Sequence, residues 1–166
     1  NVAIGLDTDF NPTANTSFTG YVAKTSTDGR TGNDLSYQGR FDWGDDRYGV
    51  NASHTSIGED FNPEVGLLRR TAYRQSGGNV RFSPRPGWRG IRKVYYEASV
   101  DYLTDRDNQP ESKGLSGGYR MDLENGDTMS VSISRDFERL DRQFEVGTDV
   151  FVPVGSYTFN NLQGTY

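Results

Sequence analysis

Hydrophobic and polar side chains alternate along most of this chain. In residues 93–102, for example, Val94 and Tyr96 fall on one side of the alternation, and Glu97 and Asp101 fall on the other. A period of two is typical of a β-strand whose two faces meet different surroundings. The clearest alternating runs are 36–43, 93–102, 114–123 and 129–137, and weaker ones lie at 18–24, 47–57, 79–83 and 157–166. Because no segment keeps a helical period, the pattern predicts an all-β chain.

The alternating runs predict about eight or nine strands of roughly 9–12 residues, the length of a tilted strand that crosses a membrane. Residues 1–6 alternate as well, so we expect the chain to begin inside a strand. No linker or change of composition divides the sequence. We therefore expect residues 1–166 to form a single domain.

Turn signals separate the runs. Gly44–Asp46 and Glu124–Asp127 are short enough for tight hairpins, and Asn125-Gly126 predicts a type I′ turn with positive φ at both residues. The longer polar connections are expected at 26–34, 84–90, 104–111 and 138–155. The last of these is the expected extracellular loop. Its apolar content, including Phe144 and Phe151, leaves two interpretations open: it folds over a barrel mouth, or it continues as strand.

Two architectures produce this alternation, a soluble β-sandwich and a transmembrane barrel. Charged residues occupy the polar faces in mid-strand, as in a water-filled or ionically packed lumen; they are Arg40, Arg81, Glu97, Asp101, Arg120 and Asp122. Aromatic residues lie near strand ends on the apolar faces, as in the girdles at lipid interfaces; they are Tyr37, Trp43, Tyr48, Tyr96 and Tyr102. These features favour an antiparallel up-and-down transmembrane β-barrel, or a contiguous fragment of a larger one.

Composition narrows the function classes. Only 33% of the residues are hydrophobic, which excludes a helical membrane protein because no apolar run approaches the roughly 20 residues of a spanning helix. Cysteine is absent and His54 is the one histidine, so thiolate sites and most histidine-dependent catalysis are excluded. The net charge of -5 argues against nucleic acid as a partner.

The tetrapeptide Asp-Phe-Asn-Pro occurs twice, at 9–12 and at 60–63. Oxygen-bearing side chains lie in and around both copies: Asp7, Asp9 and Asn11 in the first, Asp60 and Asn62 in the second. One interpretation is a calcium site in a loop, because Ca²⁺ takes six to eight oxygen ligands. The other is turn chemistry, in which Asp and Asn cap their own backbone, Pro fixes φ and Phe anchors the loop. No other cofactor is expected.

Three further features bear on partners. A basic cluster from Arg69 to Lys93 could face lipopolysaccharide phosphates or anionic solutes, or could pair with lumen carboxylates. Trp88, in a Pro/Gly/Arg turn, is a candidate for stacking on a sugar. Acidic pairs such as Asp45–Asp46 show no glycosidase arrangement, so we predict that the chain is not an enzyme.

Several strings resemble a bacterial outer-membrane β-barrel domain of unknown function, which usually follows a family 9 carbohydrate-binding-like domain. The strings are Gly5–Pro12, Gly58–Gly66, Leu67–Arg70 and Arg81–Pro86, and the resemblance extends from Asn1 to Tyr166. It implies the outer membrane of a Gram-negative-type bacterium. Carbohydrate-binding or hydrolase labels in that family belong to the companion domain, and the resemblance carries over no catalytic residues. The family's barrel is longer than this chain, which implies a fragment or a short relative.

We therefore predict an outer-membrane barrel protein that acts as a porin-like pore or a scaffold with a polar, charged lumen. A link of this protein to glycan handling is left open. Its expected partners are membrane lipid and lipopolysaccharide, with other membrane subunits or glycans as further candidates. Two alternatives stay open: a soluble β-sandwich that binds carbohydrate, with or without calcium, and a non-catalytic subunit of a larger membrane assembly.

Overall fold

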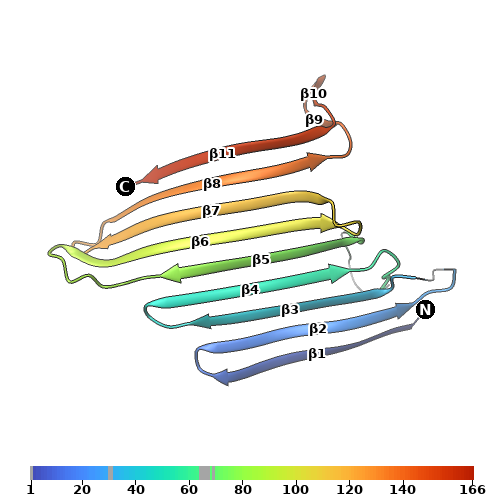
Figure 1. Cartoon of the computed structure of the whole chain (residues 1–166), viewed down its shortest axis with the longest axis horizontal. Helices are drawn as coiled ribbons and strands as arrows, with labels where there is room; N and C mark the ends of the chain where they lie inside the picture. Colours follow the sequence, from blue (N-terminus) through green and yellow to red (C-terminus); the bar gives the residue numbers. More distant parts are fainter. Residues whose placement is uncertain (1, 30–31, 64–67, 69) are drawn as a thin grey trace.

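β-Strands make up all the regular structure in the computed structural model, which describes residues 2–29, 32–63, 68 and 70–166. Figure 1 shows the strands side by side in one layer, and they pair antiparallel in chain order. The sheet contains β1 (Val2–Thr13), β2 (Thr16–Ser26), β3 (Leu35–Gly44), β4 (Tyr48–Ile57), β5 (Tyr73–Phe82), β6 (Ile91–Asp105), β7 (Pro110–Leu123), β8 (Thr128–Leu140) and β11 (Gly155–Thr165). The predicted all-β, antiparallel up-and-down fold is thereby confirmed. Within these residues no helix is long and apolar enough to cross a membrane.

The sheet is open, so a closed barrel is not confirmed, and the alternative of a contiguous fragment of a larger barrel stays a prediction. β1 pairs only with β2 and β11 pairs only with β8, so both strands are edges. Nine strands that alternate in direction leave the first and the last parallel to each other (Figure 1). A seam between β1 and β11 would therefore be a parallel one in an otherwise antiparallel sheet.

The strand register divides the side chains into two faces, because directly paired residues point to the same side of a sheet. One face, here called the apolar face, includes Leu6, Val22, Tyr37, Ala52, Val80, Val100, Leu115 and Ile133. The opposite face, called the polar face, includes Asp7, Tyr21, Gln38, Asn51, Asn79, Asp101, Ser116 and Ser134. The predicted alternation thus holds in register across the whole sheet.

The connections lie at two ends of the sheet. One end, the turn end, holds connections 14–15, 45–47, 83–90 and 124–127. The other end, the loop end, holds connections 27–34, 58–72, 106–109 and 141–154. The predicted long connection at 104–111 is shorter than expected, because β6 continues to Asp105 and β7 begins at Pro110.

The hairpin between β7 and β8 corrects one turn prediction. Only Gly126 has positive φ, at 97°, so the expected type I′ turn does not form. Instead, the amide of Gly126 donates to the Leu123 carbonyl and the amide of Asp127 donates to the Asn125 side chain. This is a type I turn followed by a left-handed glycine, the three-residue hairpin loop. The side-chain bond lets Asn125 cap the turn without adopting positive φ itself.

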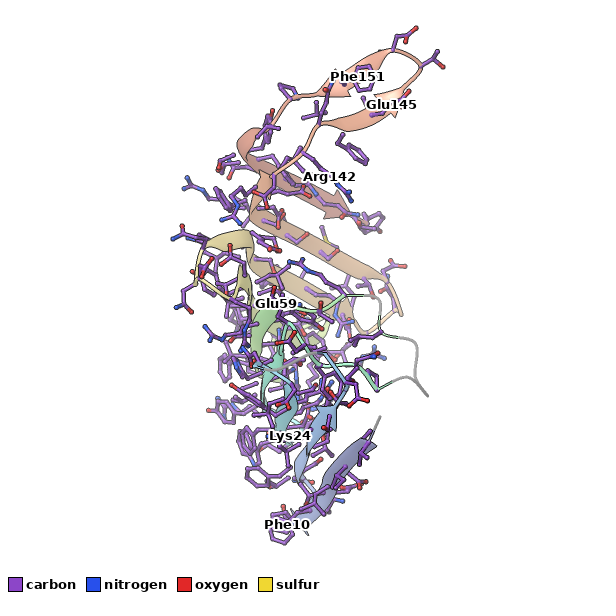
Figure 2. The ribbon with its side chains drawn as sticks, turned by 90° about the vertical axis from the view of Figure 1, so that its right-hand side faces the viewer. Phe10, Lys24, Glu59, Arg142, Glu145 and Phe151 are labelled. Carbon is purple, nitrogen blue, oxygen red and sulfur yellow. The ribbon has the colours of Figure 1, made fainter. Side chains whose placement is uncertain are left out.

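The predicted long loop 138–155 contains a second, separate hairpin. β8 extends to Leu140, and β9 (Phe144–Gly147) then pairs with β10 (Val150–Val152) before β11 begins. Figure 2 shows this hairpin, with Glu145 and Phe151, beyond the edge of the sheet opposite Phe10. The interpretation that the segment continues as strand is confirmed for these seven residues.

The sheet has almost no hydrophobic core. Among the described residues, the buried hydrophobic side chains are Ile57, Phe61 and Val94. The chain exposes 11400 Å², whereas a compact protein of its mass exposes about 8,200 Å². Apolar-face side chains such as Leu115, which is 61% exposed, account for part of this excess. In water, a sheet with this exposed surface would lack the burial of apolar side chains, which is the main contribution to folding stability. The apolar face therefore requires a cover that the sheet does not itself provide.

Candidate functional site

The six predicted lumen charges all lie on the polar face. The register places Arg40, Arg81, Glu97, Asp101, Arg120 and Asp122 on the side of the sheet opposite Val80 and Val100. They come from β3, β5, β6 and β7. The structure thus places all six on one face of the sheet, but their hydrogen-bond and ion-pair partners differ.

The turn end holds a cluster of cations around Asp46. The Asp46 carboxylate accepts hydrogen bonds from Arg85 at 2.8 Å and from Lys93 Nζ at 2.8 Å. Lys93 is only 7% exposed and also donates to the Asp46 carbonyl. These two cations hold the pKa of the Asp46 carboxyl far below its usual range. The cluster joins the turn after β3 to the connection between β5 and β6.

Arg81 belongs to the same cluster, although the sequence suggests a different partner. Its direct cross-strand neighbour is Glu97. The guanidinium instead donates to the backbone carbonyls of Asp45 at 2.7 Å and Tyr48 at 3.2 Å. Arg81 therefore secures a hairpin turn, and its positive charge is not used to pair with Glu97.

Asp122 is the buried acid of the polar face. It is 8% exposed, and its carboxylate accepts hydrogen bonds from Arg92 and from the Tyr95 hydroxyl, each at 3.3 Å. Arg120 approaches the same carboxylate at 3.8 Å and stacks over the Tyr95 ring, 3.9 Å from its centroid. Basic residues therefore do pair with Asp122, whereas its position in a lumen stays a prediction.

In the middle of the polar face, acidic side chains are present without cations to pair with them in the part of the chain that the structure describes. Glu97, Asp101 and Asp136 have no cation within ion-pair distance among the described residues; Asp101 accepts only the Gln75 amide, and Asp136 accepts a serine hydroxyl. A tight pair farther from the strand ends is Arg40–Asp42, at 2.6 Å. Cations are thus engaged at the turn end and, through Arg139–Asp105, at the loop end. The three acids in the middle of β6 and β8 remain uncompensated among the described residues.

The polar face is hollowed in two places. A groove of about 550 Å³ at the turn end is lined by polar side chains that include Asn11, Asp42, Asn51, Asn79 and Arg81. A second groove, of about 390 Å³, lies beside the uncompensated acids and is lined by Ser53, Ser99, Asp101, Ser116 and Asp136. Both would accept water and small polar solutes.

Aromatic rings form a band on the apolar face near the turn end. Tyr48, Phe82, Tyr96 and Tyr119 lie on four successive strands, with ring centroids 5.3, 6.1 and 5.3 Å apart. A second row joins Phe10, Phe18 and Phe41 across β1 to β3, at 6.3 and 4.9 Å. The predicted residues Trp43, Tyr48 and Tyr96 belong to this end of the sheet.

A second aromatic group lies toward the loop end. The Tyr37 ring is 5.8 Å from His54, whose Nδ1 is 2.8 Å from the Ser76 hydroxyl, and Tyr102 lies farther along the sheet. Tyr96 and Tyr102 are six residues apart on β6, which is about 20 Å along a strand. The two aromatic groups thus bound a central band of mainly aliphatic and small residues.

Sequence reasoning missed part of the aromatic bands. Phe82 and Tyr119 are central members of the row at the turn end, yet neither was among the predicted interface residues. Tyr119 shares the alternation of 114–123 with Leu115 and was recoverable from that pattern. Phe82 was hidden because the alternation around it is weak and two glycines precede it in β5.

The two Asp-Phe-Asn-Pro copies have different structures. The first is not in a loop: Asp7, Asp9 and Asn11 lie on β1, where Asn11 donates to Asp9 at 2.7 Å. The second is in the connection after β4, where Asp60 accepts the amide of Asn33. Phe61 is buried, and the backbone amide of Asn62 donates to the Thr25 hydroxyl. Both polar contacts reach a distant segment and are not the local backbone caps of the turn interpretation. Glu64, which directly follows the second copy in the sequence, is outside the described residues.

The calcium prediction gains no support from this placement. Asp7 and Asp9 come from an edge strand, and Asp60 and Asn62 from the loop end, so the two sets do not share one site. Within the described ranges, no three acidic or histidine side chains gather closely enough to hold a metal ion. Trp88 lies in the 83–90 connection and is 61% exposed. Its role in sugar stacking stays a prediction.

The basic cluster predicted from Arg69 to Lys93 is divided between the two ends. Arg70 and Arg74 lie toward the loop end, where they donate to Glu111 and Asn108. Arg85 and Lys93 lie at the turn end around Asp46. Arg69 is outside the described residues. The described members of the cluster therefore form no single basic surface.

Comparisons of the chain with protein-family models, curated proteins and solved structures give no match. The resemblance to an outer-membrane barrel domain therefore stays a prediction.

Proposed function

We propose that this sheet is a wall of a transmembrane β-barrel in a bacterial outer membrane. In this proposal the apolar face contacts acyl chains and the polar face lines an aqueous lumen. The barrel acts as a pore or as a scaffold. The chain itself performs no catalysis.

The observation that carries the proposal is the segregation of the two faces over an open sheet. All nine strands have 10 to 15 residues, enough to cross a membrane at a tilt. The apolar face is uncovered, and aromatic side chains bound its aliphatic band. Acyl chains would cover this face without a matching protein layer. They would also fill the space above Gly39, Ala52 and Gly117, small residues that would contribute little to a sandwich core.

The uncompensated acids suggest what a pore of this kind would pass. Glu97, Asp101 and Asp136 face the proposed lumen, whereas Arg81, Arg85 and Lys93 are engaged in the cluster around Asp46. Rings of acidic side chains favour cations in a channel. We infer a preference for cations, the opposite of the anion selectivity that the basic residues suggest when the sequence alone is considered.

The open edges favour a second candidate, in which the chain is one part of a larger membrane assembly. Unpaired strand edges are not tolerated in hydrocarbon, so β1 and β11 would need partners in a bilayer. An entirely antiparallel closed wall would require an odd number of further strands between β11 and β1. This candidate shares the lipid-facing and lumen-facing surfaces of the first.

Detergent dependence tests the proposal against the soluble sandwich. The full chain is expected to stay in solution only with detergent or lipid, and to migrate faster on a gel before heating than after. A monodisperse chain in buffer alone, with no effect of heating, would favour the soluble alternative.

Conductance in planar bilayers then separates pore from scaffold. A pore should give discrete current steps with a reversal potential that favours cations in a salt gradient. The triple variant Glu97→Gln, Asp101→Asn, Asp136→Asn should lose this preference. Asp127→Asn, in the turn between β7 and β8, is the matched control and should retain it. Membrane insertion without current would indicate a scaffold.

A further inference from the structure

Acidic and basic side chains are distributed unequally between the two faces of the sheet. Six strand acids lie on the polar face: Asp7, Asp42, Glu97, Asp101, Asp122 and Asp136. Glu111 lies at a register shift in β7 and pairs with Arg70. Four strand cations lie on the apolar face. Lys24, Arg74 and Lys113 lie toward the loop end, and Arg135 lies nearer the middle of the sheet, in register with Leu115. A cation at the middle of a lipid-facing strand is costly, and the cost falls toward the interface. Lys24, Arg74 and Lys113 therefore lie where a lipid headgroup would lie, and the long Arg135 side chain would extend toward the same level.

Lys113 and Arg135 differ from the other two cations. Lys24 lies 3.7 Å from Asp34, and Arg74 donates to Asn108. Lys113 and Arg135 are both exposed, and neither forms an ion pair with a carboxylate among the described residues. They are diagonal neighbours on β7 and β8, because Lys113 pairs with Phe137 two residues beyond Arg135. Long side chains at such positions can reach one common ligand.

The surface around this pair is a groove with aromatic walls. It measures about 440 Å³ and is lined by Tyr102, Lys113, Leu115, Arg135 and Phe137. The Lys113 ammonium lies 5.3 Å from the centroid of Tyr102 and 5.6 Å from that of Phe137. The rings and Leu115 would contact acyl or sugar surfaces, while the cations would bind an anion.

We propose that Lys113 and Arg135 bind a phosphate of lipid A, the phosphorylated glycolipid anchor of lipopolysaccharide, on the outer leaflet. The loop end supports this leaflet, because long loops of outer-membrane barrels are extracellular. Arg135 would bind the phosphate in a bidentate manner and Lys113 would act as a point charge. This inference rests on the proposed function, since it requires the apolar face to lie in the membrane.

The test uses the full chain, reconstituted in phosphatidylcholine vesicles with or without lipid A and extracted in mild detergent. Native mass spectrometry measures the fraction of chains that retain lipid A as its content is raised. The double variant Lys113→Gln, Arg135→Gln should weaken retention about tenfold or more. Lys113→Arg should retain it. Arg120→Gln, which removes an exposed cation from the polar face, is the matched control and should bind lipid A as the natural chain does.

Insertion is measured separately, by quenching of Trp43 fluorescence with lipids brominated on their acyl chains. Equal quenching in the natural chain and the double variant shows that both are inserted. If the natural chain and the double variant show equal quenching and also retain lipid A equally, this inference is overturned and the proposed function is not. The inference would also be overturned if the natural chain retained lipid A without its phosphates as well as it retains lipid A. The same holds if it retained phosphatidylglycerol as well as lipid A. Absence of quenching in the natural chain would overturn the proposed function together with this inference.

Discussion

Individual residues explain why the loop end and the turn end keep their shapes. Gly58 lies against the start of β3, where its amide donates to the Leu35 carbonyl at 2.8 Å. A Cβ on Gly58 would lie 1.9 Å from the carbonyl oxygen of Asn33. At the opposite end, Asp46 gathers Arg85 and Lys93. Neither contact could be predicted from the sequence, because each joins segments that only the strand register brings together.

Replacement of Gly58 by Ala should destabilise the folded sheet by about 1–3 kcal/mol, because Asn33 must move to admit the methyl group. The measurement is the midpoint of urea unfolding in detergent micelles. Gly39→Ala is the matched control, since nothing lies within 4 Å of a Cβ at Gly39. Equal midpoints for the two variants would contradict the close approach at Gly58.

The cluster around Asp46 predicts a dependence of stability on acid. Its folded-state pKa is lowered by Arg85 and Lys93, so the carboxylate contributes stability above its unfolded pKa of about 3.9. That contribution is lost as the pH falls below this value. Unfolding followed from pH 7 to pH 2 should show the loss in the natural chain.

Asp46→Asn should be less stable at neutral pH and should lose part of this acid dependence. The control is Asp107→Asn, in the connection between β6 and β7. Its side chain makes no hydrogen bond or ion pair to a described residue, so it should retain the full dependence. The account would be wrong if Asp46→Asn followed the same acid profile as the natural chain.

At the scale of elements, the alternating pattern was the most informative part of the sequence. The runs at 36–43, 93–102, 114–123 and 129–137 all lie within single strands, and their opposite faces match across the register. Where the alternation is weak, the predicted secondary structure was less accurate. Residues 7–12 were expected in a loop because they contain Asp, Asn and Pro, yet they form part of β1. Proline is tolerated there because β1 is an edge strand.

The difference between the two faces can be tested on β8 with adjacent residues. Ile133 lies on the apolar face and Ser132 on the polar face. Ile133→Arg should cost up to about 2–4 kcal/mol of folding stability in lipid vesicles, because it places a cation on the lipid-facing side of β8, and Ser132→Arg should cost much less. The folded fraction is read from heat-modifiable gel migration along a urea series. Equal losses in the two variants would contradict a lipid-facing Ile133.

At the scale of the whole molecule, the sequence predicted the strand pattern but not how the sheet would end. Closure depends on which strands meet at β1 and β11, and local alternation carries no information about that pairing. The charge balance of the polar face was also unpredictable. Arg81 and Glu97 are direct neighbours, yet the arginine bonds a turn and leaves the acid uncompensated.

The edges give a prediction for the chain in a bilayer. β1 and β11 expose backbone groups that lipid cannot hydrogen-bond, so both strands must pair with further strands, or with each other, after insertion. Hydrogen exchange in lipid vesicles should then protect β1 amides as strongly as those of β5. Protection of β5 with rapid exchange throughout β1 would show an open edge, which is incompatible with a membrane-spanning wall.

The most direct test of the central claim is a spin-label scan of β6 in lipid vesicles. The chain contains no cysteine, so single cysteines at residues 96–102 can each carry one label. Labels at 96, 98, 100 and 102 should collide mainly with oxygen, which concentrates in acyl chains. Labels at 97, 99 and 101 should collide mainly with a water-soluble nickel reagent. The two accessibilities should therefore alternate out of phase. If they instead rise and fall together along β6, the apolar face does not contact acyl chains.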